Sequence, residues 1–350
     1  MQLPFHRVIA PLVAALSVTC VACGGEDPPS TPQPPAEFNA PTSTLGASIE
    51  ALDTPPGGED TFCIHRRLDN AEAGYVRNIR GTLGEGSHHL IAYVSDEVEE
   101  QLTPEPCGGF SGILVFDEGG VPGLDSANVP IFIAQQPYVE LKMPTDDGHP
   151  VAFRIEAQQM LRFELHWFNT TSEARDVQGK LELDLVSEAD AQDAGVIESS
   201  FGFWGTMDID IAPHAEATTP LLFQSALSGT KTFAVTTHQH HLGTRMRIWH
   251  DDAPDNAGQL GAGARLLADS NTWAEPPLEM LDPPLAFGDG QGLAYQCEWN
   301  NTTDETIGFG EGFNDEMCFL WSYYYPSDGF DICVHFSEGS TEGVCNHLLR

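Results

Sequence analysis

The segments of this chain with a clear period alternate apolar and polar residues, which is the pattern of a β-strand with one buried face. They cover residues 161–167, 180–185 and 207–211, whereas no amphipathic helical stretch of three turns stands out. The 34 glycines and 25 prolines supply many turns. The sequence therefore predicts an all-β fold of antiparallel, jelly-roll-like β-sandwiches.

A polar stretch at residues 187–195 marks the best boundary between two halves of the chain. We expect two tandem domains, at residues 59–190 and 191–350, because each would then have an ordinary domain size. No internal repeat indicates a propeller or a solenoid.

The N-terminus has the features of an export signal. Arg7 precedes a mostly apolar run at residues 8–22, which is too short to span a bilayer comfortably. The run ends at Ala22-Cys23, which resembles a bacterial lipobox, where a lipid is attached to the cysteine. Cys23 is a better candidate than Cys20 because a small residue precedes it. We expect residues 1–23 to be a signal peptide with a lipobox; ordinary cleavage without a lipid is the alternative.

Residues 24–58 are rich in proline and poor in apolar residues, which predicts a disordered tether. A lipid on Cys23 and this spacer would hold a folded body away from a membrane surface. The predicted location is therefore the outer membrane, with the protein facing the periplasm or the cell surface. The membrane would be a partner only through the N-terminal lipid.

The formal net charge of −37 restricts the partners of this chain. Such a surface repels nucleic acid and anionic lipid headgroups, so no nucleic-acid partner is expected. Solubility is the simplest role for the charge.

Six cysteines remain once Cys20 and Cys23 are assigned to the export signal. An even number in an exported protein indicates disulfides, although six cysteines permit 15 pairings. The six are Cys63, Cys107, Cys297, Cys318, Cys333 and Cys345.

A histidine pair, His88 and His89, begins an apolar strand and follows two glycines, Gly84 and Gly86. Adjacent side chains of a regular strand face opposite sides, so both could bind one ion only at a strand start or a bulge. The glycines favour such an irregular entry; otherwise one histidine would lie in the core and the other in solvent. His166 lies on the polar face of its expected strand, where a surface histidine is the simpler interpretation.

His238 and His240 are two residues apart in an expected strand, so their imidazoles would face the same side and chelate one ion. Imidazole suits copper, zinc, iron and nickel, and the thioether of Met317 would favour Cu(I). Met317 by itself would be interpreted as a core residue, but a disulfide at the neighbouring Cys318 would brace its strand. His241 points the other way and is a structural candidate. These residues predict a copper site for one-electron and O₂ chemistry.

Five motifs follow one another between about residues 60 and 330. They are a cysteine before a basic patch at residues 63–68, the pair at 88–89, a strand ending in a single histidine at 166, the HxHH-Leu-Gly stretch at 238–243, and Glu-Met-Cys at 316–318 before a tyrosine-rich strand. In this order they resemble the copper type II, ascorbate-dependent monooxygenases, the family of peptidylglycine α-hydroxylating monooxygenase and dopamine β-hydroxylase.

The resemblance implies two β-sandwich domains and two copper ions per chain, each bound mainly by one domain across a solvent-filled cleft. By position, His88, His89 and His166 would hold the electron-transfer copper. His238, His240 and Met317 would hold the copper that binds O₂ and hydroxylates the substrate. The family draws two electrons from ascorbate, and another reductant could replace it here.

The same resemblance suggests the disulfides Cys63–Cys107 and Cys297–Cys318. Cys333 and Cys345, which are close in sequence, would then pair with each other. The bond at Cys318 would brace the strand that carries the methionine ligand.

The chain departs from the family where substrate is bound. Peptidylglycine enzymes anchor a peptide carboxylate through an arginine before the HxH pattern and an asparagine and a tyrosine after the methionine. Thr236, Phe319 and Trp321 occupy these positions here, so an amidating enzyme is not expected. Phe319 and Trp321 suggest a more apolar or aromatic substrate. Glu164 stands where the amidating enzyme has a glutamine.

We therefore predict an exported copper-dependent monooxygenase that hydroxylates a small organic substrate with O₂ and an external reductant such as ascorbate. The rival is a lipoprotein that stores or delivers copper without turnover, and two dissimilar, separated sites argue against it. A purely structural surface sandwich is the third alternative.

Overall fold

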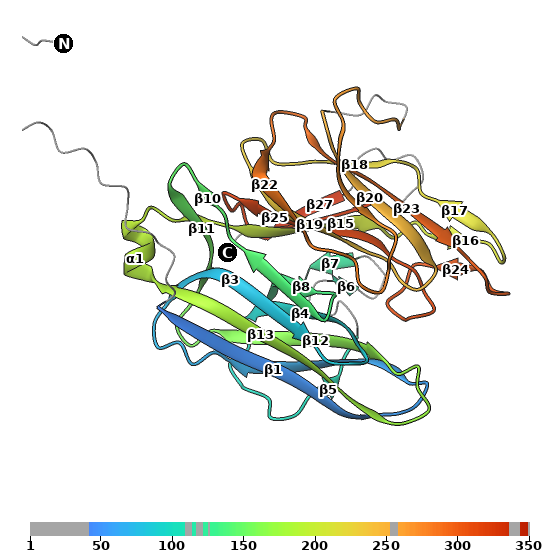
Figure 1. Ribbon diagram of the computed structural model, residues 1–350, viewed down its shortest axis with the longest axis horizontal. Coiled ribbons are helices and arrows are strands. Elements are labelled where there is room, and N and C mark those ends of the chain that lie inside the picture. Colours follow the sequence, from blue (N-terminus) through green and yellow to red (C-terminus); the bar gives the residue numbers. More distant parts are fainter. Residues whose placement is uncertain are drawn as a thin grey trace, which may run out of the picture. The chain divides into compact units, whose positions relative to one another are not determined.

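A computed structural model describes residues 42–108, 114–116, 122–124, 127–252, 258–335 and 344–348. In this part of the chain the strands form two sandwich-like bodies (Figure 1). We call residues 43–198 the N-terminal body and residues 200–348 the C-terminal body. The predicted all-β class of antiparallel sandwiches is confirmed. The expected signal peptide, Cys23 and residues 24–41 of the expected tether lie outside the described residues.

Two sheets make up most of the described N-terminal body. The first contains β1 (Ser43–Thr54), β3 (Gly74–Leu83), β9 (Tyr138–Lys142), β10 (Thr145–Asp146), β11 (His149–Ile155), β13 (Arg175–Ser187) and β14 (Ile197–Glu198). The second contains β2 (Glu59–Arg67), β4 (Ser87–Ser95), β5 (Glu105–Pro106), β8 (Asn128–Ala134) and β12 (Met160–Phe168). A separate hairpin joins β6 (Leu114–Phe116) to β7 (Pro122–Leu124). The order β5-β2-β12-β4-β8 makes β12 the central strand of the second sheet.

The described C-terminal body also has two main sheets. One has the order β22 (Glu279–Ala286), β19 (Lys231–His238), β25 (Cys318–Tyr325), β15 (Ser200–Thr206), β26 (Phe330–His335) and β27 (Val344–Leu348). The other contains β17 (Glu216–Thr218), β18 (Leu222–Ser225), β20 (Gly243–Asp251), β21 (Arg265–Ser270) and β23 (Gly292–Asn300). A short pair joins β16 (Asp210–Ile211) to β24 (Ile307–Gly308).

A short helix, α1 (Glu188–Asp193), lies at the expected boundary between the halves. It begins after Ser187, whose hydroxyl accepts the Asp190 N–H at 3.2 Å, the usual N-cap arrangement. After the helix, β14 pairs with β11, so the chain leaves the first sheet only after residue 198. Among the described residues, no helix reaches the length and apolarity that a membrane crossing requires.

The alternation of polar and apolar residues corresponds to a partly exposed polar face in β13 but to a buried polar face in β12. In β13 the leucines at residues 181–185 are buried and the intervening acidic side chains are half-exposed, as in a strand with one wet face. In β12 residues 160–167 are all buried, including the polar Glu164 and His166. The C-terminal body lies against this polar face, since the rings of His166 and His240 are neighbours. The interpretation of His166 as a surface residue is therefore wrong.

Two expectations of local structure are also wrong. The tether cannot extend to residue 58, because Ser43–Thr54 forms β1 and pairs with β13. Ile49 is fully buried there, so this stretch has an apolar face between its flanking prolines. Residues 207–211 do not form one strand, because β15 ends at Thr206 and only Asp210–Ile211 is extended again.

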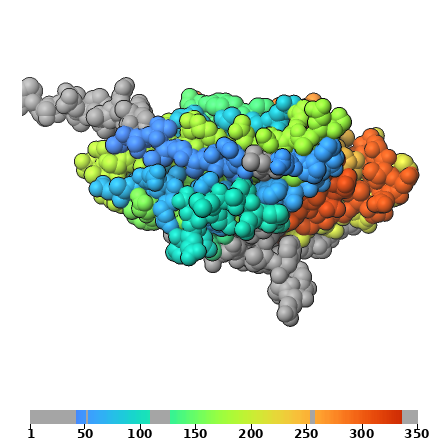
Figure 2. Space-filling model, turned by 90° about the horizontal axis from the view of Figure 1, so that it is seen from below, coloured from blue at the N-terminus to red at the C-terminus, as the bar shows by residue number. Residues whose placement is uncertain are grey.

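One hydrophobic core runs through both bodies. Phe132 of β8 belongs to the same cluster of buried side chains as Phe319 and Tyr323 of β25. The Ile133 N–H donates to the Tyr323 hydroxyl across the boundary at 3.2 Å. On the face shown in Figure 2, blue to green residues of the N-terminal body adjoin orange residues of the C-terminal body. The two bodies therefore share apolar surface.

Both disulfides that the family resemblance suggests are present, Cys63–Cys107 and Cys297–Cys318. Cys333 is also disulfide-bonded, and the backbone register of β26 and β27 places Cys345 directly opposite it. Such bonds persist in oxidising compartments, so they indicate an extracytoplasmic location.

Candidate metal centre

The adjacent histidines of β4 reach the same side through an irregular strand entry, as the glycines before them predict. Gly86 has a φ of +88°, a conformation that glycine adopts readily. The register of β4 against β12 pairs His89 with His166 and then shifts, which leaves His88 outside the regular pairing. This is the geometry of a β-bulge, and it places the ring centroids of His88 and His89 5.2 Å apart.

His166 completes the first predicted set of ligands. Nitrogen atoms of His88, His89 and His166 all lie within 4.8 Å of one another. None of the three side chains is more than 5% exposed. The structure thus brings together three imidazoles that come from two neighbouring strands.

The second pair of histidines sits at the end of a strand and in the turn after it. His238 is the last residue of β19, whereas His240 precedes β20 in a turn closed by the Gly243 N–H and the His240 carbonyl at 2.9 Å. The prediction that one continuous strand carries both histidines is therefore wrong. The two ring centroids are nevertheless only 5.4 Å apart. His241 stacks on Phe313 and bonds its carbonyl, which is a structural role as expected.

The two sets of histidines are in contact with each other. The ring centroids of His89 and His238 are 5.2 Å apart, and those of His166 and His240 are 6.4 Å apart. All five rings are buried. The expected solvent-filled cleft between the sets is therefore wrong. We call these five residues the histidine cluster: His88, His89, His166, His238 and His240.

A glutamine of the N-terminal body decides the tautomer of His238. The Gln135 amide donates to the Thr237 carbonyl at 2.9 Å and to the Thr236 hydroxyl at 3.2 Å. Its Oε1 therefore faces Nδ1 of His238, at 2.6 Å. Because that oxygen can only accept, Nδ1 carries the proton and Nε2 carries the lone pair.

Hydrogen bonds likewise decide which nitrogen carries the proton in two further rings. His240 Nδ1 donates to the Asp315 carbonyl at 3.0 Å, and among the described residues its buried Nε2 has no hydrogen-bond partner. His166 Nε2 donates to Glu59 Oε1 at 2.9 Å, which leaves the lone pair on Nδ1. A metal-binding histidine normally has its other nitrogen fixed in this way. The cluster therefore has the form of a metal centre.

Burial keeps four imidazoles of the cluster neutral, those of His88, His89, His238 and His240. It lowers the pKa of His88, His89 and His238 well below the ordinary value, and neighbouring histidines add to the effect. Burial, followed by the proximity of His166, lowers the pKa of His240 to about 4. Neutral imidazole is the form that binds metal, so protons do not compete for these rings at neutral pH.

Glu59 links the two bodies at the cluster. Its Oε1 accepts hydrogen bonds from His166 of the N-terminal body and from the backbone N–H of Phe313 of the C-terminal body. Burial acts to raise the pKa of Glu59, but the hydrogen bond and charge interaction with His166 and the Phe313 N–H hold it below the ordinary value. The carboxylate is therefore an acceptor for both bodies.

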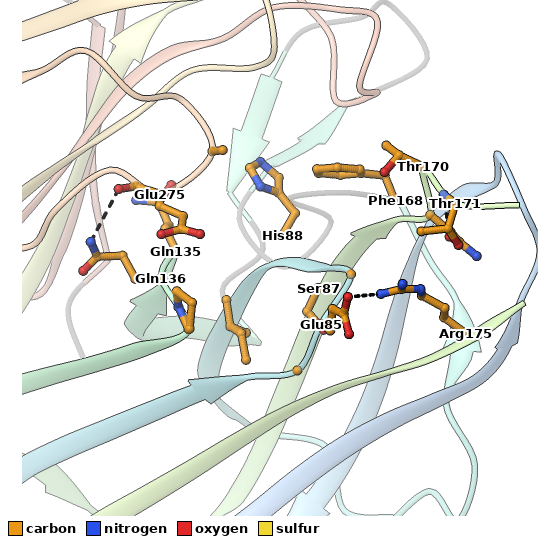
Figure 3. A pocket seen from close by; sticks show the side chains of 16 residues that line it. Glu85, Ser87, His88, Gln135, Gln136, Phe168, Thr170, Thr171, Arg175 and Glu275 are labelled. Carbon is orange, nitrogen blue, oxygen red and sulfur yellow. Dashed lines mark hydrogen bonds and ion pairs between the residues drawn. The ribbon is translucent and has the colours of Figure 1, made fainter. Parts of the chain in front are cut away.

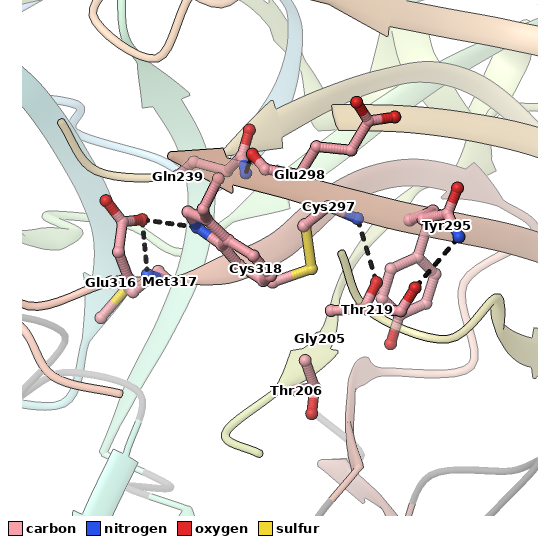
Figure 4. The surroundings of a disulfide bond; sticks show 12 residues. Gly205, Thr206, Thr219, Gln239, Tyr295, Cys297, Glu298, Glu316, Met317 and Cys318 are labelled. Atoms are coloured by element: carbon pink, nitrogen blue, oxygen red, sulfur yellow. Dashed lines mark hydrogen bonds between the residues drawn. A yellow bond between two sulfur atoms is a disulfide. The ribbon is translucent and has the colours of Figure 1, made fainter. Parts of the chain in front are cut away.

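A second carboxylate, Glu316, holds the turn that carries His240. Its two oxygens accept the backbone N–H groups of His240 and Leu242 at 3.0 and 2.7 Å and the indole N–H of Trp299 at 2.9 Å. The N–H of Met317 also donates to it, at 3.3 Å (Figure 4). Burial raises the pKa of Glu316 to about 7 against the opposing effect of these bonds.

Met317 lies immediately before β25, on whose register Phe319 is opposite His238. Its side chain is 1% exposed and packs in the core that both bodies share. The neighbouring Cys297–Cys318 bond ties β25 to β23, as the bracing argument expects (Figure 4). In the chain, Met317 directly follows Glu316, the residue that holds the turn of His240.

A cavity of about 510 Å³ reaches the cluster at His88 (Figure 3). Phe168 lines it and contacts Trp273 and Phe313, at centroid distances of 5.9 and 5.1 Å. Trp273 is also 5.4 Å from the ring of His88. An aromatic group from each body therefore stands beside the first histidine set.

The cavity does not include the two aromatic residues that suggested an apolar substrate. Phe319 and Trp321 are fully buried, and Phe319 stacks on Phe203 at 4.3 Å in the core. This stretch of β25 therefore faces packed protein. The expectation that they contact substrate is wrong.

Two of the three supporting residues, Gln135 and Glu59, carry no pattern that identifies them in the sequence. Gln135 is 103 positions from His238, and Glu59 is 107 positions from His166. Such pairs are brought together by the fold alone. Glu316 had a local signal, an acidic residue directly before the candidate methionine.

Comparison with known proteins adds a family to this geometry. Residues 193–344 match the family model of the copper type II ascorbate-dependent monooxygenase, C-terminal domain. A stretch of 114 residues is 29% identical to tyramine beta-hydroxylase of Caenorhabditis briggsae, and it spans 32% of this chain and 19% of that protein. The chain therefore carries a domain similar to the C-terminal domain of copper monooxygenases, and this domain includes His238, His240 and Met317.

Solved structures show weaker likeness. A chain fitted into a reconstruction of the virophage Sputnik is 8% identical, with a TM-score of 0.27 over 83% of this chain and 95% of that one. A chain of Sulfolobus Turreted Icosahedral Virus is 9% identical, with a TM-score of 0.19 over 79% of this chain and 59% of that one.

Proposed function

We propose that this protein is an exported copper-dependent monooxygenase that hydroxylates a small organic substrate with O₂ and an external reductant such as ascorbate. The observation that carries this proposal is the buried histidine cluster, part of which lies in the domain similar to copper monooxygenases. Imidazole ligands suit copper, and a thioether favours its Cu(I) state. Copper would supply one-electron transfer and activation of O₂.

Each body would hold one ion. His88, His89 and His166 are the ligands that we propose for the electron-transfer copper. His238, His240 and Met317 are those for the copper at which substrate is hydroxylated. Hydroxylation places one oxygen atom of O₂ in a C–H bond and reduces the other to water, so the reductant must supply two electrons and two protons.

The described cavity at His88 opens at the first histidine set, and none of the three ligands proposed for the hydroxylating copper lines it. Phe168 forms part of its wall, and Glu85 and Glu275 add carboxylates, of which Glu85 is already paired with Arg175 (Figure 3). The relative is named as acting on tyramine, which is an aromatic amine, and such compounds are the first to test.

The protein would act outside the cytoplasm. Its disulfides agree with that location, and lipidation of Cys23 would attach it to the outer membrane through residues 24–41. The two bodies would act as the two domains expected on either side of residues 187–195.

Copper content and O₂ consumption test the proposal together. Elemental analysis of the reconstituted protein should give two copper ions per chain. Ascorbate and a panel of aromatic amines and phenolics should then support O₂ consumption, and mass spectrometry should find a product one oxygen atom heavier. Copper binding without any such turnover would favour a copper-storage protein instead. Negligible copper binding would favour a purely structural β-sandwich protein.

Two substitutions test the division of roles. Met317→Ala should weaken turnover while the copper of the first set stays bound, and His88→Ala should remove that copper and stop multiple turnover. His149→Ala, a change at an exposed histidine of β11, is the matched control and should alter neither. Loss of both metals from either of the first two variants would contradict the two-site assignment.

A further inference from the structure

We infer that Gln135 and Glu59 are positioning residues that act across the boundary between the two bodies, each fixing a metal-binding histidine together with the opposite body. The inference rests on the proposed function only for the identity of the metal, because the contacts themselves are independent of that function. Both residues belong to the N-terminal body, and each also bonds the C-terminal body.

The first contact runs from the N-terminal body to the C-terminal body. Gln135 follows β8 and is 3% exposed, and its amide makes three hydrogen bonds to residues 236–238 of β19. Two of these bonds use the amide nitrogen, which leaves the oxygen for His238 Nδ1. Because the amide cannot turn over without losing both donor contacts, His238 is held as the Nδ1–H tautomer. Its Nε2 is thereby directed to the cluster.

The second contact is made by Glu59. The loop that contains Phe313 and Asp315 donates one backbone N–H to Glu59 and accepts the Nδ1–H of His240 at its Asp315 carbonyl. Glu59 in turn accepts the Nε2–H of His166. One loop therefore touches the support of His166 in one set and His240 itself in the other. A carboxylate bonded to a ligand histidine also raises the basicity of the ring.

This arrangement explains why the two histidine sets are in contact. Hydrogen bonds of Gln135 hold the end of β19 against the N-terminal body, and the hydrogen bond of Glu59 holds the Phe313 loop near β12. The ring centroids of His89 and His238 are 5.2 Å apart between these two supports. The spacing of the two metal positions therefore depends on two side chains of the N-terminal body.

The tautomers can be measured without any copper. Long-range proton–nitrogen NMR of the metal-free protein with ¹⁵N-labelled histidine should show His238 as the Nδ1–H form and His166 as the Nε2–H form. Gln135→Leu should move His238 toward the other tautomer, and Glu59→Ala should do so for His166. Gln135→Glu should retain the wild-type form because it keeps an acceptor oxygen. The matched controls Gln136→Leu and Asp60→Asn should change neither ring.

Copper provides the second measurement. Gln135→Leu should weaken binding of Cu(II) to the His238 site roughly 10- to 100-fold and change its EPR hyperfine splitting, which a change of fold stability alone would not do. Gln135→Glu should restore the splitting. If Gln135→Leu does not fold, Gln135→Asn, which withdraws the same amide, is expected to give the same shifts.

The outcomes separate this inference from the proposed function. A His238 ring that stays Nδ1–H in Gln135→Leu, or an EPR signal indifferent to it, would overturn the positioning role and leave the oxygenase intact. Wild-type protein that takes up no copper would overturn the oxygenase, while the NMR result would still decide the positioning role.

Discussion

At the scale of single residues, the metal centre depends on side-chain oxygens that accept hydrogen bonds from backbone N–H groups as well as from other side chains. Glu316 is fully buried and takes four N–H donors from three segments of the C-terminal body. A side chain that satisfies several buried donors leaves them unpaired when it is altered, and each unpaired donor costs the desolvation of that group. The turn that carries His240 should therefore be sensitive to this one residue.

We expect Glu316→Gln to lower the free energy of unfolding by roughly 1–3 kcal/mol, because the new amide nitrogen would face N–H donors instead of accepting from them. It should also weaken copper binding at the His240 site. Denaturant titration and copper titration measure the two effects. Glu305→Gln, at an exposed position nearby, is the control and should be close to wild type.

At the scale of elements, β4 and β12 show how a strand can present two adjacent histidines on one side. The bulge at His88 follows Gly86, whose positive φ turns the chain into β4. A Cβ at residue 86 would meet Val177 Cγ1 at 3.2 Å, tighter than an ordinary contact. The glycine is therefore needed for both its conformation and its size.

Gly86→Ala should destabilise the protein more than Gly148→Ala does. Gly148 has a similar φ of +85°, but a Cβ added there would meet no atom of the described residues within 4 Å, so it isolates the backbone cost of about 1 kcal/mol. Gly86→Ala should in addition reduce copper binding at the His88 site. Equal stability losses and unchanged copper binding in the two variants would refute the role given to the bulge.

In the first sheet of the N-terminal body, one carboxylate links three neighbouring strands, β1, β13 and β3. Asp184 of β13 accepts hydrogen bonds from Arg80 and Asn78 of β3 and from Thr44 of β1. The Arg80 hydrogen bond is the largest cause that lowers the pKa of Asp184 from 3.8 to about 2. The charged form is thus favoured in the folded state.

The stabilisation from Asp184 should be present above about pH 4 and disappear as the pH falls through 2, because the folded pKa lies below the unfolded one. We expect Asp184→Asn to cost roughly 1 kcal/mol at pH 6, after allowance for solvent screening of the pair, and almost nothing near pH 2. Denaturant titrations across this range measure the difference. Asp176→Asn, at an exposed position of the same strand, is the control.

At the scale of the whole molecule, the shared core makes the two bodies dependent on each other. Buried residues of β8 and β25 lie in one cluster, and the Tyr323 hydroxyl accepts a backbone N–H from β8. Phe132, Phe319 and Tyr323 are fully buried in this cluster, and aromatic side chains bury a large apolar area. Separation of the bodies would expose that surface.

We therefore expect the described part of the chain to unfold in one cooperative transition. Calorimetry and near-UV circular dichroism should give the same midpoint for both bodies, and Tyr323→Ala should lower that midpoint as a whole. Tyr324→Phe, which removes a hydroxyl bonded within the C-terminal body, should have a smaller effect. Two resolved transitions would show that the bodies are independent.

Local patterns in the sequence were sufficient for the class of fold and for most candidate ligands. Alternation over two residues reports a strand directly, and the glycines before His88 predicted the irregular entry that the bulge provides. Histidine pairs at short spacing were visible in the same way. Such patterns cannot contain the identity of the surface that will cover a strand. The pattern around His166 by itself therefore indicates a solvent-exposed face, although the family resemblance makes His166 a ligand, and β1 lies within the predicted tether.

The tertiary structure alone decided that the two histidine sets touch, that no solvent-filled cleft separates them, and that Phe319 and Trp321 belong to the core. It also supplied Gln135 and Glu59, which lie more than a hundred positions from the rings they hold. The physical reason is that hydrogen bonds and burial depend on distance in space, and packing of the two bodies on one core sets those distances independently of any local sequence period.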